Sequence, residues 1–167
     1  MDFTVRPEEE GDIEQVREIL RLAFPTDAES KLVDALRKNG KAILSLVAVN
    51  DRDVLGHIMF SPVSTTPSSE AKGIGLAPLA VKPKFQSKGI GSQLCREGLC
   101  RCKELAYDYV VVLGSPEYYG RFGFKRASDF NLQNEYGVDD EFMVVFFSEK
   151  SACRMVKYAL EFSMFSV

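Results

Sequence analysis

A short glycine-containing segment between an apolar run and an amphipathic stretch constrains this chain most. The apolar run ends at Val81, and residues 86–92 read Gln-Ser-Lys-Gly-Ile-Gly-Ser. The spacing of Leu94 and Leu99 then predicts a helix that begins at the second glycine. The segment therefore predicts a helix N-terminus shortly after a strand, as in folds that mix helices and a sheet.

Such a helix N-terminus is suited to an anion. Its first backbone N–H groups have no partner within the helix, and the helix dipole places partial positive charge there. Gly89 and Gly91 have no Cβ atom, so a phosphate group could approach the backbone nitrogens of residues 87–92. Three lysines lie nearby in the sequence: Lys82, Lys84 and Lys88. The pattern favours a phosphate site, and the alternative is a lysine-rich turn before an ordinary helix.

Two common phosphate motifs are incomplete or missing. The dinucleotide fingerprint G-x-G-x-x-G would require glycine at position 94, where the chain has Leu94. The nucleotide motif G-x-x-x-x-G-K-[ST] occurs nowhere in the sequence. A nucleotide-binding oxidoreductase domain is therefore a disfavoured alternative, and binding of a nicotinamide dinucleotide would revive it.

The hydrophobic periodicity predicts a mixed α/β protein with one sheet and helices on its faces. Strands are expected at 3–7, 43–50, 54–65, 73–81, 108–114 and 139–147, and helices at 12–24, 28–39, 91–106 and, as a short turn, within 115–123. The ambiguous tail alternates at Val156, Tyr158, Leu160 and Phe162, which favours a strand over a helix.

Three residues predict local features of these elements. Asp12 is expected to cap the helix at 12–24, and Gly40 to stop the helix at 28–39. Pro78 removes one backbone donor, so the strand at 73–81 is expected to be irregular or bulged there.

Composition narrows the class of protein. The 167 residues fit a single domain, 1–167, and the net charge of −3 argues against nucleic acid as a partner. The N-terminus shows no secretory signal, and no apolar run reaches the ~20 residues of a membrane span, which predicts a cytoplasmic protein. Four cysteines without a C-x-x-C pair and a single histidine predict no metal site.

The chain resembles the GNAT superfamily of N-acetyltransferases. The resemblance lies in the order of four features. They are a Leu79-Ala-Val81 strand end, the Gln86-Ser-Lys-Gly-Ile-Gly91 loop, a helix and the apolar strand VVVLG at 110–114. It continues in Tyr119-Gly-Arg-Phe-Gly-Phe124, where a tyrosine precedes a Gly-Phe pair. The runs GLAPLAV and LGSPEYYGRFGF further resemble the YhbS-like subgroup.

The resemblance implies a GNAT-like fold, with one central, mostly antiparallel mixed sheet flanked by helices. Two strands of that sheet would splay apart to form an acyl-CoA cleft, and acetyl-CoA would be the co-substrate. Backbone groups of Leu79, Ala80 and Val81 would pair with the pantetheine amides. The diphosphate would be held by Gln86, Ser87, Lys88, Gly89, Ile90, Gly91 and Ser92.

The resemblance also suggests catalytic residues. Tyr119 matches the family tyrosine that approaches the CoA sulfur and can act as a general acid, and the alternative is a packing aromatic. The strand position where many members carry a glutamate is Gly75 here, so direct proton abstraction from that position is excluded. Glu29 is the preferred carboxylate, with Glu117 and Glu70 as alternatives, whereas His57 is expected to be structural.

The predicted function is an N-acetyltransferase that moves an acetyl group from acetyl-CoA directly to a primary amine in a ternary complex. The alternative on the same fold is a non-catalytic acyl-CoA-binding sensor. The acidic composition is compatible with a cationic acceptor, either a small amine or a protein amine, and the acceptor itself stays open. A homodimer is a possibility that the sequence leaves undecided.

Overall fold

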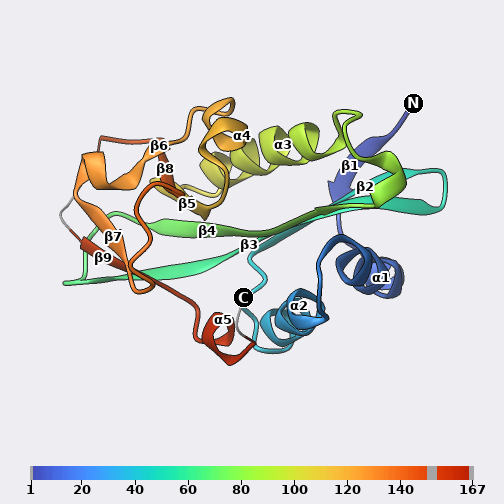
Figure 1. Ribbon diagram of the computed structural model, residues 1–167, viewed down its shortest axis with the longest axis horizontal. Coiled ribbons are helices and arrows are strands. Elements are labelled where there is room, and N and C mark those ends of the chain that lie inside the picture. Colours follow the sequence, from blue (N-terminus) through green and yellow to red (C-terminus); the bar gives the residue numbers. More distant parts are fainter. Residues whose placement is uncertain (1, 150–153, 166–167) are drawn as a thin grey trace. The chain divides into compact units, whose positions relative to one another are not determined.

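The computed structural model describes residues 2–149 and 154–165, so Cys153 lies outside the described residues. Its contacts divide the chain into two compact units, each assembled from distant segments (Figure 1). The first unit comprises Met1–Phe60, Pro78–Gly98 and Leu160–Val167, and the second comprises Ser61–Ala77 and Leu99–Ala159. Three elements pass from one unit to the other: β3 (Asp53–Thr66), β4 (Gly73–Val81) and α3 (Ile90–Glu104).

Antiparallel strands form the sheet of the first unit. β1 (Thr4–Pro7) pairs with β2 (Leu44–Asn50), and β2 pairs with the first part of β3. The turn between β2 and β3 includes Asp51, whose φ of 52° is the left-handed conformation that aspartate tolerates better than most residues. The strands predicted at 43–50 and 54–65 are therefore confirmed, and they pair as an antiparallel hairpin.

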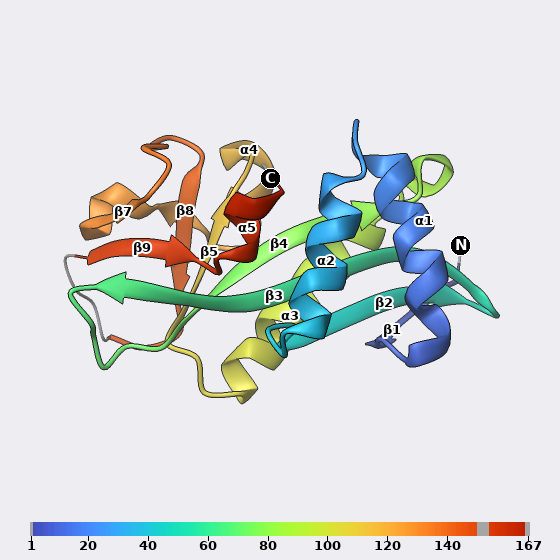
Figure 2. The same cartoon turned by 90° about the horizontal axis from the view of Figure 1, so that it is seen from below.

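Helices α1 (Ile13–Ala23) and α2 (Ala28–Lys38) lie side by side in the first unit (Figure 2). Their buried apolar residues recur at helical spacing and are Val16, Ile19, Leu20, Leu32, Val33 and Leu36. Gly40 ends α2 as predicted, with a φ of 71°. The backbone N–H of Lys41 donates to the carbonyl of Leu36 at 2.8 Å, which closes the helix end.

Asp12 has a different role from the predicted one. Its side chain makes no capping hydrogen bond to α1. Instead, its carboxylate accepts hydrogen bonds from the Arg6 guanidinium at 2.7 and 3.0 Å and from the backbone N–H of Glu9 at 2.7 Å. A guanidinium competes successfully for a carboxylate because charged hydrogen bonds are the stronger ones.

The predicted strand at the tail is correct only in its first half. β9 (Arg154–Tyr158) is a strand, but the chain then forms α5 (Glu161–Met164), which leaves Leu160 71% exposed. The buried Glu161 carboxylate accepts hydrogen bonds from Asn39 Nδ2 at 2.7 Å and Lys41 Nζ at 2.8 Å. These contacts to residues far away in sequence override the local alternation.

The second unit contains the central parallel pair. β4 pairs with β5 (Tyr109–Leu113) in parallel, and β5 pairs with β8 (Phe142–Phe146) in antiparallel orientation. The two-residue β6 (Lys125–Arg126) joins β8, while β7 (Leu132–Asn134) pairs with β9, which also pairs with β3. Strands of two or three residues are too short to show a periodicity, so the sequence did not predict β6 and β7.

The predicted fold class is confirmed: this is a mixed α/β protein with a mostly antiparallel open sheet and flanking helices. The division into two compact units does not decide whether residues 1–167 behave as one domain, which stays a prediction. Among residues 2–149 and 154–165, every helix falls short of the length or apolarity needed to cross a bilayer.

His57 lies fully buried in the first unit, as expected for a structural histidine. Its Nε2 lies 2.9 Å from Ser45 Oγ, and it lies 4.0 Å from the carboxylate of Glu8. Glu8 is itself held by Arg37, whose Nε donates to Glu8 Oε2 at 3.1 Å. Burial, and secondarily the charge of Arg37, lowers the pKa of His57 to about 3.

This low pKa predicts that the fold loses stability as the pH falls below about 6.5. The unfolded chain binds a proton at His57 near pH 6.5, whereas the folded chain does not until about pH 3, so stability rises with pH across that window. The free energy of unfolding should fall by about 2 kcal/mol between pH 7.5 and pH 5. Urea denaturation at each pH measures it.

The matched variant is His57→Gln, because the chain contains a single histidine. The Asp12 and Glu161 carboxylates, whose pKa values are lowered, lose their contribution only at more acidic pH. The variant should therefore show a flat profile between pH 7.5 and pH 5. Equal slopes in both proteins would contradict the assignment to His57.

Candidate functional site

The end of β4 is joined to α3 by a loop whose start is fixed to the sheet of the first unit. The backbone N–H of Lys82 donates to the carbonyl of Leu55 in β3 at 2.8 Å. A short helical turn, η2 (Pro83–Phe85), follows, and the Gln86 side-chain amide reaches back to donate to the carbonyl of Val81 at 3.2 Å. The structure thus brings the predicted strand end and the predicted loop together.

Gly89 is required by the backbone conformation of this loop. Its φ is 87°, which residues with a Cβ atom rarely adopt, and no atom lies within 4 Å of the position that a Cβ would take. Ser87 also has a positive φ, of 62°. The loop therefore turns sharply into the helix and leaves open space above Gly89, which suits the approach of a ligand.

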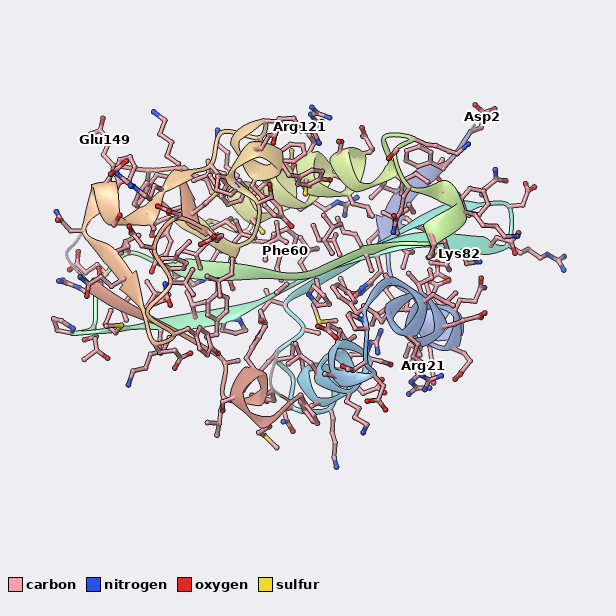
Figure 3. All side chains as sticks on the ribbon, in the orientation of Figure 1. Asp2, Arg21, Phe60, Lys82, Arg121 and Glu149 are labelled. Atoms are coloured by element: carbon pink, nitrogen blue, oxygen red, sulfur yellow. The ribbon has the colours of Figure 1, made fainter. Side chains whose placement is uncertain are left out.

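The start of α3 is anchored by packing against β3. The side chain of Ile90 is buried, and a Cβ placed on Gly56 of β3 would lie 3.1 Å from both Ile90 and Leu94. Farther along α3, Gly98 has no side chain because the ring of Phe60, labelled in Figure 3, occupies that space. These close contacts hold the first turn of the helix in a fixed position on β3.

Positively charged side chains occur in the segment that leads to this helix start. Lys84 and Lys88 are exposed, and Lys82, labelled at the end of β4 in Figure 3, is half-buried. α3 begins at Ile90 and Gly91, and the first N–H groups of a helix generally have no acceptor within the helix. The loop can therefore hold a strongly charged anion such as a diphosphate.

β4 extends from Gly73 to Val81 and includes Pro78, where the predicted irregularity stays a prediction. The pairing between β4 and β5 that the structure describes covers Gly73–Leu76 and Tyr109–Val112. Pro78 lies beyond that paired stretch. Leu79 and Val81 at the strand end are half-buried and Ala80 is buried.

Tyr119 belongs to the second unit, on the short helix α4 (Pro116–Gly120) directly after β5. The helix is capped by Ser115, whose Oγ accepts from the backbone N–H of Tyr118 at 3.3 Å. The ring of Tyr119 lies against Gly114, where a Cβ would be 2.9 Å from Tyr119 Cδ2. Edge-to-face contacts with Tyr118 at 5.0 Å and Phe124 at 5.7 Å fix its orientation.

The candidate carboxylates have different environments. Glu29 lies in the first turn of α2, and its Oε1 is buried with no hydrogen-bond partner among the described residues. Glu117 and Glu70 are exposed. A buried carboxylate oxygen is normally satisfied, so the open position at Glu29 is the one that a ligand could complete.

Gly75 has no room for a side chain. A Cβ there would lie 2.8 Å from Cε1 of Tyr158 and 3.1 Å from Cγ1 of Val63. Tyr158 comes from β9, in the tail where the sequence pattern was ambiguous. Sequence reasoning therefore missed it, and the strict alternation around it was the only signal available.

The structure shows no group of three or more metal-ligating side chains in the part of the chain that it describes. Burial raises the pKa of the Cys102 thiol to about 12, so that side chain stays protonated and unreactive. Cys95 is buried as well, and Cys100 is exposed on α3.

Residues 4–127 match the family model of the acetyltransferase (GNAT) domain, which is more than half of the chain. The chain belongs to the GNAT family of acetyltransferases. It is 36% identical over 142 residues, 84% of each chain, to the uncharacterized N-acetyltransferase YhbS of Escherichia coli K12. The family and the YhbS resemblance predicted for this GNAT protein are thereby confirmed.

Two solved GNAT structures resemble it over nearly the whole chain. The crystal structure of Escherichia coli YhbS in complex with CoA superposes with a TM-score of 0.90 at 35% identity, and covers 96% of this chain and 92% of that one. A GNAT acetyltransferase from Brucella melitensis in complex with acetyl-CoA gives a TM-score of 0.82 at 34% identity, and covers 96% and 98%. The predicted activity class, an acetyl-CoA-dependent N-acetyltransferase, agrees with these relatives.

Proposed function

We propose that this GNAT protein transfers the acetyl group of acetyl-CoA directly to a primary amine, and that the loop at residues 86–92 holds the CoA diphosphate. The observation that supports this most is the start of α3. There, Gly89 leaves open space in front of the first-turn N–H groups, and Lys82, Lys84 and Lys88 supply positive charge.

Each step of the reaction has a candidate group. Backbone groups of Leu79–Val81 would pair with the pantetheine amides, as an added strand does. The neutral amine attacks the thioester carbonyl carbon, and the C–S bond then breaks with its electron pair on sulfur. Tyr119 would give its phenolic proton to the departing thiolate, because a phenol with a pKa near ~10 is protonated at neutral pH.

Glu29 is proposed to receive the acceptor amine. Its buried Oε1 has no hydrogen-bond partner among the described residues, and an ammonium group would supply one. The same carboxylate can then take a proton from the amine, directly or through a water molecule. A cationic acceptor, either a small polyamine or a protein amine, fits this group. A cytoplasmic location and a homodimer remain predictions.

Two measurements test this function. Calorimetry with acetyl-CoA should show binding to the wild-type protein, with competition by CoA and none by NAD. Release of CoA thiol should then be followed with three acceptors: spermidine, a peptide with a free N-terminus, and an N-terminally blocked peptide that contains lysine. Binding without transfer to any amine would favour the sensor alternative, and a folded protein that does not bind acetyl-CoA would exclude both.

Glu29→Gln tests the proposed base with little change in shape. The variant should lower kcat/KM for the amine by about 10²-fold, since a neutral amide neither attracts an ammonium group nor accepts its proton. Acetyl-CoA affinity should be unchanged. The matched control is Asp27→Asn. The Asp27 side chain is 58% exposed and forms an ion pair with Lys31 on the surface of α2. Equal amine kinetics in wild type and Glu29→Gln would contradict this role.

A further inference from the structure

Two tyrosine rings lie on the backbone near the end of the pairing between β4 and β5. Their described pairing ends at Leu76 and Val112, and we call this end of the pairing the fork. Gly75, one residue before the fork on β4, lies under the ring of Tyr158. Gly114, two residues beyond the fork on β5, lies under the ring of Tyr119. Both glycines allow a phenol to lie directly on the backbone.

Tyr158 is held firmly in this position. It is 7% exposed, and β9 pairs with β3 so that Tyr158 lies opposite Val63. Its backbone N–H donates to Glu135 Oε1 at 3.1 Å, and its ring lies 6.2 Å from that of Tyr136. The atoms of Tyr158 nearest to Gly75 are Cε1 and Cδ1, at 2.8 and 3.1 Å from a placed Cβ, so one edge of the ring lies along β4.

The two phenols differ in burial, since Tyr158 is buried and Tyr119 is half-buried. Burial raises the pKa of Tyr158 well above its usual value, and the neighbouring Tyr136, Tyr119 and Glu135 raise it further. In a pair of interacting phenols, the more buried one keeps its proton. Tyr158 is therefore a hydrogen-bond donor and neither an acid nor a base at ordinary pH.

We propose that Tyr158 is a second catalytic residue, whose hydroxyl donates a hydrogen bond to the thioester carbonyl oxygen of acetyl-CoA. This inference rests on the proposed function, in which Tyr119 protonates the departing thiolate, so that the thioester would lie beside Tyr119. An oxyanion needs a donor that keeps its proton, and the departing thiolate needs one that releases it. The buried phenol suits the first task, and the half-buried Tyr119 suits the second.

The chemical balance is simple. As the amine nitrogen forms a bond to the carbonyl carbon, the C=O π electrons move to oxygen, and that oxygen accepts the hydrogen bond from Tyr158. When the intermediate collapses, the C=O bond re-forms and the C–S electron pair moves to sulfur. The thiolate takes the proton of Tyr119, the nitrogen loses a proton to water, and water returns a proton to the Tyr119 phenolate. Tyr158 keeps its own proton throughout.

An acceptor-independent experiment tests this hydrogen bond. Acetyl-CoA labelled with ¹³C at the thioester carbonyl is bound to the full-length protein, and the carbonyl resonance is compared with that of the free compound. Donation to the carbonyl oxygen should shift the resonance downfield in wild type and in Tyr136→Phe. Tyr158→Phe keeps the ring on Gly75 and removes only the hydroxyl, so the resonance should return toward its free position.

Kinetics give a second readout. With an amine that wild type acetylates, Tyr158→Phe should lower kcat by about 10²-fold while KM for acetyl-CoA changes by less than about twofold. Tyr136→Phe, whose parent side chain is 40% exposed, should retain wild-type kcat. Circular dichroism and thermal melts establish that each variant is folded.

The outcomes separate this inference from the function on which it rests. If wild type binds acetyl-CoA and Tyr158→Phe leaves both the carbonyl resonance and kcat unchanged, Tyr158 is a packing residue and the inference is wrong. If wild type does not bind acetyl-CoA, the proposed function fails, and this inference fails with it. Loss of kcat together with a restored carbonyl resonance in Tyr158→Phe supports both.

Discussion

Gly91→Glu should abolish measurable acetyl-CoA binding in calorimetry while the protein stays folded. Gly91 is the second residue of α3, where glutamate is compatible with a helix and favourable for the helix dipole. A carboxylate about 5 Å from a diphosphate charge of about −2 is repelled by several kcal/mol at an effective dielectric constant of about 20. Affinity should therefore fall by on the order of 10²-fold or more.

Gly91→Gln is the matched control, because it has the same size without the charge. It should weaken binding less than Gly91→Glu, and the difference between the two should shrink at high salt. Gly89 is a poorer position for this test, since its φ of 87° strains any side chain placed there. Unchanged acetyl-CoA affinity in Gly91→Glu would show that the diphosphate binds elsewhere.

Tyr119→Phe should lower kcat by about 10²-fold or more, with acetyl-CoA affinity unchanged. The phenylalanine ring keeps the contact with Gly114 and the edge-to-face contacts with Tyr118 and Phe124, so the fold should be retained. Only the proton for the leaving thiolate is removed. Stopped-flow or steady-state assays of CoA thiol release measure the change.

Tyr118→Phe is the control for Tyr119→Phe, because Tyr118 is adjacent, half-buried and in the same ring cluster. The guanidinium of Arg121, labelled beside α4 in Figure 3, lies 4.6 Å from the centre of the Tyr118 ring, so that side chain is already engaged in packing. Tyr118→Phe should retain wild-type kcat. Equal losses in the two variants would indicate that the cluster as a whole, rather than one hydroxyl, supports the reaction.

The anion loop could be predicted from the sequence because its determinants are local. A helix start needs only the apolar spacing after Gly91, and the positive φ of Gly89 follows from the absence of a Cβ atom. The long strands, α1, α2 and the family likewise follow from periodicity and from motifs within short segments. The order of these motifs was enough to indicate an N-acetyltransferase.

The site beyond that loop depended on contacts between distant segments. The packing around α2 buries Glu29 Oε1, which has no hydrogen-bond partner among the described residues. The spacing of residues 24–30 in the sequence does not reveal this. The tail was predicted as one strand, yet Glu161 is buried against Asn39 and Lys41, more than 100 positions earlier in the chain, and this favours a helix there.

By itself, the sequence determined the family, the glycine loop and the candidate acid Tyr119, because each is recognised from a motif of consecutive residues. Only the tertiary structure decided that the ring of Tyr158 fills the space above Gly75. A sequence shows that a side chain is missing at position 75, but not which other side chain occupies the space. The pairing of β9 with β3 places Tyr158 there, and strand pairing across about 90 residues depends on the whole fold rather than on local pattern.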